Sequence, residues 1–192
     1  MRCILPIILA TLSLSCAAAD LPERTGVITL RDKPLTLVGP ALVVGSPAPE
    51  ATLRDGSLTP TTLAAASKGV RIVITVPSLD TPVCTREAQA FSQKIAGLKD
   101  ISVVLVSRDL PFAQKRSCAA NKIENLTLLT DFDQAALGRA WGLSIKETGL
   151  LARAVVVLDA AGIVRWQQIV PNLAQEPDYD AALKAAGELV SK

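Results

Sequence analysis

The sequence predicts an α/β fold in which a mixed central sheet is flanked by helices and preceded by a β-hairpin. Two observations predict it. Continuous apolar runs, typical of strands covered on both faces, alternate with helical patterns along most of the chain. Near the N-terminus, two short runs of β-forming residues flank a polar turn. A length of 192 residues suits one domain rather than two.

Residues 1–19 are predicted to be a secretory signal peptide that precedes this domain. A basic start at Arg2 leads into the apolar run Ile4–Leu14, and small residues end the segment at Ala19. The run is too short to cross a bilayer, which takes roughly 20 apolar residues. Cleavage after Ala19 leaves a domain over residues 20–192, exported to the periplasm. Lipidation of Cys16 is a second outcome, but Ser13-Leu14-Ser15 lacks the Leu that a typical lipoprotein signal has three positions upstream of the cysteine, so soluble export is favoured.

The first elements of the domain are a hairpin and a loop. The runs Thr25–Leu30 and Pro34–Val38 surround the turn Arg31-Asp32-Lys33 and predict two paired strands. The next stretch, Gly39–Pro60, is rich in Gly and Pro and predicts a loop with little regular structure.

The remaining elements complete a thioredoxin-like layout. Buried strands are predicted at Val70–Val76, Ile101–Ser107, Leu126–Leu129 and Ala154–Leu158, the last pairing in a hairpin with Ile163–Val170. Helices are predicted at Val83–Leu98, Pro111–Ala120, Gln134–Trp141 and Tyr179–Val190. In the first helix, the spacing of Cys84, Ala88, Phe91 and Ile95 predicts a buried stripe.

The composition excludes several kinds of chemistry. Histidine is absent, so neither a Ser-His-Asp triad nor a histidine-based zinc site can form. A net charge of +2 offers no argument for a nucleic-acid partner. Four cysteines remain as candidate nucleophiles, and loss of the signal peptide leaves only Cys84 and Cys118 as free thiols.

Cys84 lies where a thiolate is favoured. Thr81 is a suitable N-cap and Pro82 a suitable first helical residue, so Cys84 falls in the first turn of its helix. Free backbone N–H groups and the positive end of the helix dipole stabilise an anionic sulfur there, and the thiolate is the nucleophilic form of cysteine. We expect the nearby Asp80 and Glu87 side chains to face solvent.

Several segments resemble the peroxiredoxins, and in particular their bacterial thiol peroxidase subfamily. The string Pro77-Ser78-Leu79-Asp80-Thr81-Pro82-Val83-Cys84 contains the peroxiredoxin active-site pattern Pro-x-x-x-Thr-x-x-Cys. The segment from Ser107 to Cys118, the segment Leu151–Val157 and the segment Glu176–Tyr179 are similar to the subfamily as well. The resemblance covers about residues 25–190.

The resemblance implies a role for each of five residues. Cys84 matches the peroxidatic cysteine, which attacks the O–O bond, and Cys118 matches the resolving cysteine of the same chain. Thr81 matches the residue that positions the peroxide, Pro77 the residue that shields the pocket, and Arg153 the arginine that stabilises the thiolate. Without the resemblance, Arg153 is more often a salt-bridge residue and Thr81 a plain helix cap.

The resemblance also implies partners. Hydrogen peroxide and organic hydroperoxides are the expected substrates, thioredoxin or an exported thiol reductant the expected electron donor, and a homodimer the usual assembly; no cofactor is implied. Two alternatives from another class stay open: a structural Cys84–Cys118 disulfide, common in exported proteins, and a disulfide carrier. A carrier of the thioredoxin kind has Cys-x-x-Cys, whereas position 87 here is Glu.

Overall fold

The computed structural model describes residues 20–98 and 100–190. The predicted signal peptide, residues 1–19, lies outside the described residues. The elements follow one another as β1 (Glu23–Leu30), β2 (Lys33–Val38), β3 (Leu53–Arg54), β4 (Pro60–Thr61), α1 (Leu63–Ala66), β5 (Val70–Thr75), α2 (Pro82–Lys94), β6 (Ile101–Ser107), α3 (Pro111–Ala120), β7 (Leu126–Thr130), α4 (Ala136–Ala140), β8 (Ser144–Ile145), β9 (Ala154–Leu158), β10 (Val164–Ile169) and α5 (Tyr179–Val190).

A seven-stranded mixed sheet forms the centre of the molecule, as predicted. Its strand order is β10-β9-β5-β6-β7-β3-β4. Strands β5, β6 and β7 run parallel, because α2 and α3 return the chain between them, whereas β9 is antiparallel to both β5 and β10. All six residues of β5 and all five of β9 are buried. Continuous apolar runs therefore mark the strands that are covered on both faces.

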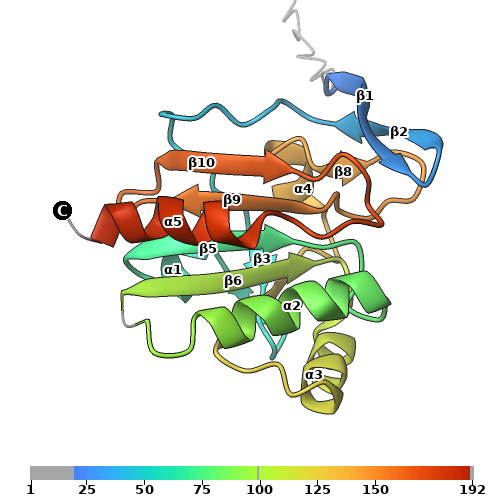
Figure 1. The fold of residues 1–192 in the computed structure, drawn as a ribbon. Coiled ribbons are helices and arrows are strands. Elements are labelled where there is room, and N and C mark those ends of the chain that lie inside the picture. The colour runs from blue at the N-terminus through green and yellow to red at the C-terminus, as the bar shows by residue number, and fades with distance from the viewer. Residues whose placement is uncertain (1–19, 99, 191–192) are drawn as a thin grey trace, which may run out of the picture.

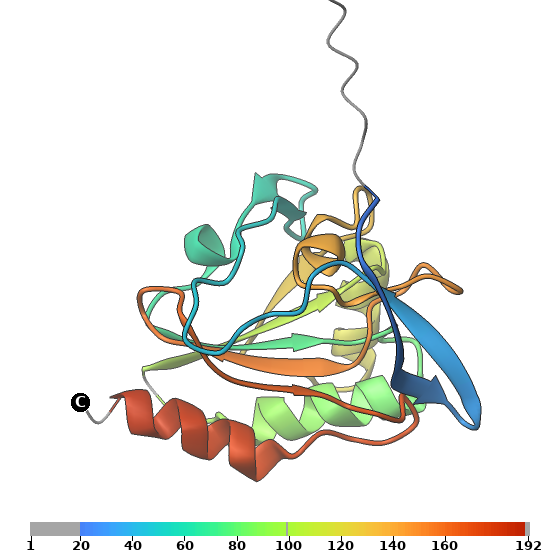
Figure 2. The ribbon, with the colours of Figure 1, turned by 90° about the horizontal axis from the view of Figure 1, so that it is seen from above.

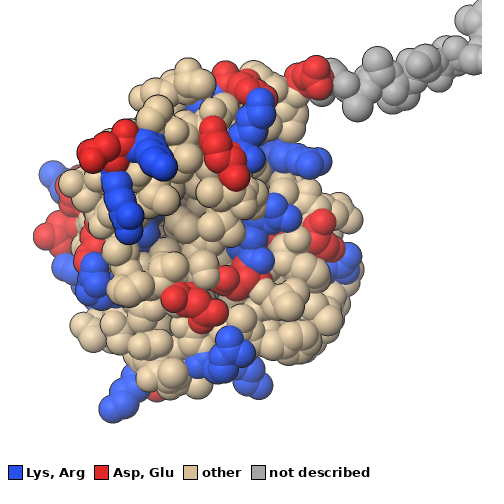
Figure 3. All heavy atoms as spheres, turned by 90° about the vertical axis from the view of Figure 1, so that its right-hand side faces the viewer, with Lys and Arg blue, Asp and Glu red and all other residues tan. Residues whose placement is uncertain are grey.

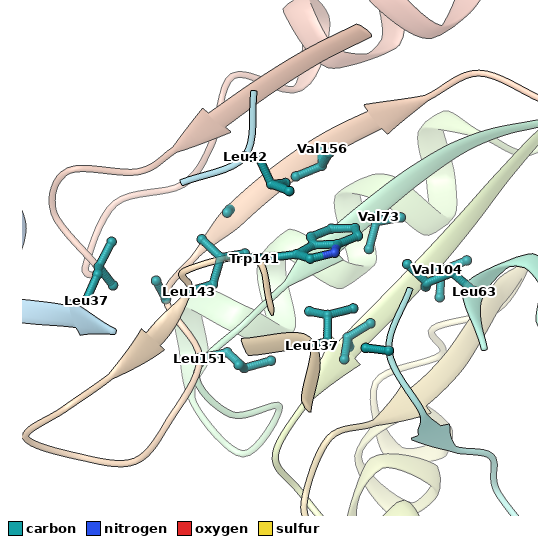
Figure 4. Packing of buried hydrophobic residues seen from close by; sticks show 14 of the residues in the cluster. Leu37, Leu42, Leu63, Val73, Val104, Leu137, Trp141, Leu143, Leu151 and Val156 are labelled. Carbon is teal, nitrogen blue, oxygen red and sulfur yellow. The ribbon is translucent and has the colours of Figure 1, made fainter. Parts of the chain in front are cut away.

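Successive side chains of these strands enter two different hydrophobic layers. Ile72 and Ile74 pack with α2 and α5 on one face, and Val73 packs with α1, α4 and the hairpin on the other. The two views show the layers on either side of the sheet (Figures 1 and 2). On the second face, Trp141 lies among core side chains such as Leu137 (Figure 4) and donates its indole N–H to the carbonyl of Pro49 at 2.8 Å.

The N-terminal hairpin is present and is fastened to the rest of the domain. Strands β1 and β2 pair as predicted, and β8 adds a third strand to this small sheet. The Thr29 N–H donates to the Pro171 carbonyl at 2.7 Å, and the Leu173 N–H donates to the Thr29 carbonyl at 2.9 Å. Both views place the hairpin turn at the end of the molecule where α2 begins (Figures 1 and 2).

Several local expectations need correction. The stretch Gly39–Pro60 contains the short strand β3, which pairs with β4 and β7, and α1 and β8 were not predicted. Elements of two to four residues show no periodicity that a sequence pattern can reveal. Helix α2 ends at Lys94 rather than Leu98, because the chain turns through Gly97, whose φ is +92°. The bounds of α3 and α5 are as predicted.

No helix in the described ranges combines the length and the apolar character that crossing a membrane requires.

Candidate active site

Cys84 is the third residue of α2 and is buried. Pro82 is the first residue of the helix, and the Cys84 side chain is 1% exposed. The predicted stripe is confirmed, since Ala88, Phe91 and Ile95 are buried in the same hydrophobic cluster. The sulfur therefore combines a place in the first helical turn with an environment from which bulk water is largely excluded.

The loop that presents this helix is organised by a carboxylate that the sequence reasoning missed. Asp109 accepts hydrogen bonds from the Ser78 hydroxyl at 2.7 Å, from the Leu79 N–H at 2.8 Å and from the Ser107 hydroxyl at 2.8 Å. Asp109 lies just after β6, a buried strand that the sequence predicts. An acidic residue at the end of a buried strand was the sequence feature that could have identified this role. Asp109 thus fixes the backbone that leads from β5 into α2.

Thr81 occupies the predicted N-cap position, but its side chain makes no capping bond. The backbone is extended there, as at an N-cap. Its hydroxyl instead donates to the Ser78 carbonyl at 2.9 Å. The preceding turn therefore takes the hydroxyl away from the helix N–H groups. Thr81 is exposed and lies on the wall of a cavity that Pro77 also lines.

Arg153 lies directly before β9 and reaches the sulfur. Its Nη2 donates to Cys84 Sγ at 3.4 Å and to the Leu173 carbonyl at 2.9 Å, and its Nε donates to the same carbonyl at 3.3 Å. The side chain is almost fully buried. Although burial disfavours the cation, the charges of Glu87 and Cys84 outweigh it and raise the Arg153 pKa. Arg153 therefore holds a fixed positive charge beside the sulfur.

Glu87 does not face solvent as expected; it is fully buried and forms an ion pair with Arg153. Burial raises its pKa to about 7 despite the opposing charge of Arg153. Its Oε1 has no hydrogen-bond partner within the described residues. The spacing places Glu87 one turn after Cys84, on the same buried face of the helix. This i, i+3 relation was the sequence feature that could have predicted the burial of Glu87. Asp80 is exposed, as predicted.

Cys118 lies on α3, and its thiol is free, as is that of Cys84. It is 7% exposed and belongs to the same hydrophobic cluster as Cys84. Burial raises the pKa of the Cys118 thiol. The neighbouring Ser117 hydroxyl donates to the Leu79 carbonyl at 2.9 Å, which ties α3 to the loop before Cys84.

A cavity of about 290 Å³ opens beside this constellation. Three of the residues expected in the site, Pro77, Thr81 and Arg153, line it together with apolar side chains from the hairpin, β8 and the segment that contains Leu173. This end of the molecule carries basic and acidic side chains interspersed with uncharged surface (Figure 3). The described residues contain no group of His, Cys, Asp or Glu that could hold a metal ion. The arrangement combines a buried thiol, a cation and a mostly apolar cavity.

Comparison with known proteins agrees with this arrangement. The Redoxin family matches residues 43–183. A thiol peroxidase of Aquifex aeolicus is 42% identical over 85% of this chain and 98% of its own length. A thiol peroxidase of Bacillus subtilis is 40% identical, with the same coverage.

Solved structures agree as well. A peroxiredoxin-like protein from Aquifex aeolicus superposes with a TM-score of 0.79 at 42% identity, over 86% of this chain and 97% of its own. The AhpC structure from Mycobacterium tuberculosis, at 22% identity, has the same fold, with a TM-score of 0.67 over 79% of this chain and 95% of its own. The chain therefore belongs to the Redoxin family and is a peroxiredoxin-type peroxidase of its thiol peroxidase branch.

Proposed function

We propose that the enzyme reduces hydrogen peroxide and organic hydroperoxides through a Cys84 sulfenic acid and an intramolecular Cys84–Cys118 disulfide, in antioxidant defence. The Cys84 thiolate attacks the terminal peroxide oxygen, the O–O bond breaks, and a proton from solvent completes the alcohol or water that leaves. The sulfenic acid then condenses with the Cys118 thiol to form the disulfide and release water. Two thiols of a reductant restore both cysteines.

The observation that carries this proposal is the contact between Arg153 and Cys84. A guanidinium remains charged at any working pH and offers several N–H donors in a fixed plane. Arg153 can therefore stabilise the anionic sulfur and also polarise the peroxide oxygen on which negative charge develops. Glu87 and the Leu173 carbonyl hold the guanidinium in place, so little reorganisation is needed when the peroxide arrives.

The cavity supports the remaining roles and the range of substrates. Thr81 is a hydroxyl-bearing residue of the lining that would hold a peroxide oxygen, and Pro77 contributes an apolar wall. A water molecule takes up about 30 Å³, and hydrogen peroxide has only one further oxygen. A cavity of about 290 Å³ therefore has room for the organic group of an alkyl hydroperoxide.

The proposed role of Cys118 as the resolving cysteine is supported by its place in the fold. Its helix is tied through Ser117 to the loop before Cys84, and the two cysteines share one hydrophobic cluster. A raised pKa keeps the Cys118 thiol protonated at neutral pH. A neutral thiol does not compete for Arg153 while Cys84 reacts, and condensation with the sulfenic acid protects Cys84 from further oxidation.

Three further parts of the proposal rest on the sequence and the family. The N-terminal pattern of residues 1–19 supports export to the periplasm, with lipidation at Cys16 as the other outcome. Export would place cytoplasmic thioredoxin out of reach, so an exported thiol reductant is the expected donor. Family resemblance supports a homodimer.

Peroxide consumption with dithiothreitol as the reductant tests the proposed function. Wild-type protein should consume cumene hydroperoxide, and Cys84→Ser should fall to the rate without enzyme because serine cannot form a sulfenic acid. Equal rates for the two proteins would refute the proposal. Cys118→Ser tests the alternative of a structural disulfide. That alternative predicts lower thermal stability of the variant and no oxidised Cys84 after peroxide treatment, whereas the proposed resolving role predicts that oxidised Cys84 accumulates.

A further inference from the structure

The cavity beside Cys84 carries a second cation besides Arg153. Arg31, from the turn between β1 and β2, also lines it. The rest of the lining is apolar apart from two threonines, and no carboxylate takes part in it. An otherwise apolar cavity with two arginines and no acidic group favours a ligand that is partly apolar and partly anionic.

The two arginines differ in how far they are already engaged. Arg153 is held by Glu87 and by the Leu173 carbonyl beside the sulfur. Arg31 is exposed and forms no ion pair with any residue in the described part of the chain. Its guanidinium is therefore available to a ligand in the cavity.

The backbone of Arg31 is unfavourable for an arginine. Its φ is +58°, in the left-handed region, which residues with a Cβ rarely adopt and glycine adopts readily. A two-residue turn gains nothing from arginine that glycine or asparagine would not supply. Such strain next to a functional site is a reason to look for a use of the side chain.

The position of Arg31 relative to the reaction centre is fixed by the fold. Thr29, two residues earlier, exchanges backbone hydrogen bonds with Pro171 and Leu173. The Leu173 carbonyl is also the group that accepts from Arg153. One short segment thus holds both the hairpin turn and the guanidinium that contacts Cys84, so Arg31 stands at a set place on the cavity wall.

We propose that Arg31 is a specificity-determining residue that binds the carboxylate of anionic organic hydroperoxides, such as hydroperoxy fatty acids, while their chain lies along the apolar wall. The inference rests on the proposed function, because it assigns the substrate class of the same cavity. A guanidinium forms paired hydrogen bonds to a carboxylate, which an ammonium group does not match. The carboxylate is unchanged in the reaction, and the hydroperoxide group is reduced to the alcohol.

Two variants of the same turn provide the test. Arg31→Asn removes the cation and suits the left-handed backbone. Lys33→Ala removes an equal charge from an exposed residue that does not line the cavity. The substrates are a hydroperoxy fatty acid and its methyl ester, and the quantity compared is the ratio of their kcat/KM values.

In wild-type protein the acid should be preferred, and the preference should weaken at high salt. Arg31→Asn should lower the acid-to-ester ratio about two- to fivefold, the range expected for a solvent-exposed ion pair. Lys33→Ala should retain most of the wild-type ratio. An unchanged ratio in Arg31→Asn, or an equal fall in both variants, would overturn the proposal. Failure of the proposed function is distinct, because wild-type protein would then reduce neither substrate.

Discussion

At the scale of single residues, the centre of the site is Arg153, whose one guanidinium contacts a sulfur, a carboxylate and a carbonyl. Such a set of contacts needs the planar fork of arginine, because the ammonium group of lysine is a single point of charge. The site therefore depends on the shape of the cation as well as on its sign.

Replacing Arg153 with Lys tests that dependence. Arg153→Lys keeps a positive charge but cannot bind Glu87, Leu173 and Cys84 together, so oxidation of Cys84 by peroxide should slow by about a hundredfold, the loss seen when one preorganised donor is removed. Rapid-mixing competition kinetics measure that rate, and a thermal melt confirms that the variant is folded. A folded variant that reacts at the wild-type rate would remove the guanidinium geometry from the mechanism.

Residue patterns predicted much of the site and missed its buried charges. Thr81, Pro77 and Arg153 line one cavity, and Arg153 also contacts Cys84. Glu87 was expected in solvent because glutamate is almost always exposed unless it is paired. Its partner, Arg153, is 66 residues away along the chain, and only the fold brings the two together. A local sequence pattern does not show which residues far apart along the chain come into contact in the fold.

At the scale of elements, α2 is held to the chain that follows α3 by a buried serine. The Ser92 hydroxyl donates to the Glu124 carbonyl at 2.6 Å and accepts from the Glu124 N–H at 2.9 Å. Both ends of α2 are therefore fixed, one by the loop that Asp109 organises and the other by Ser92.

Ser92→Ala should lower the free energy of unfolding by about 1–3 kcal/mol, because two partly buried hydrogen bonds, each worth about 0.5–1.5 kcal/mol, are lost. Urea unfolding under reducing conditions measures the change. Ser102→Ala is the matched control, since its hydroxyl makes one exposed bond of 3.3 Å to the Lys68 carbonyl and should cost less than about 0.5 kcal/mol. Equal losses in both variants would show that Ser92 does not hold α2.

Elements were predictable where they are long or clearly bounded. Pro111 at the start of α3 and the periodic pattern of α5 fixed their bounds. Strands β3 and β8 exist because their backbones pair with neighbours already in place, β7 for one and β2 for the other. Two residues supply no periodicity of their own, so tertiary pairing decides these strands.

At the scale of the whole molecule, burying Glu87 ties stability to pH. Its pKa in the folded protein, about 7, lies above the ordinary value near 4.5. Between these values the folded state binds more protons than the unfolded state, so the stability that this group contributes is present below about pH 4.5 and is lost as pH rises through 7.

The unfolding free energy of the wild-type protein should therefore fall more between pH 5 and pH 8 than that of Glu87→Gln, which cannot titrate. Denaturant unfolding of both proteins at the two values measures the difference. Asp131, whose pKa burial also raises, contributes equally to both and cancels. Parallel changes in the two proteins would mean that Glu87 has the same proton affinity in the folded and unfolded states.

The overall architecture was the most predictable level, because a few buried strands with helices between them permit few arrangements. The sheet, the hairpin and the layers all follow from apolar runs. The cavity did not, since it is assembled from the hairpin, β8, the start of α2 and the segment around Leu173, which only the tertiary structure brings together.

The most direct test of the central claim is to treat reduced protein with one equivalent of peroxide and map the cysteines by mass spectrometry. Wild-type protein should contain a Cys84–Cys118 disulfide, and Cys118→Ser should contain a sulfenic acid at Cys84 that a sulfenic-acid-specific reagent traps. Peroxide-treated protein in which Cys84 remains a free thiol, or in which oxidation begins at Cys118, would contradict it.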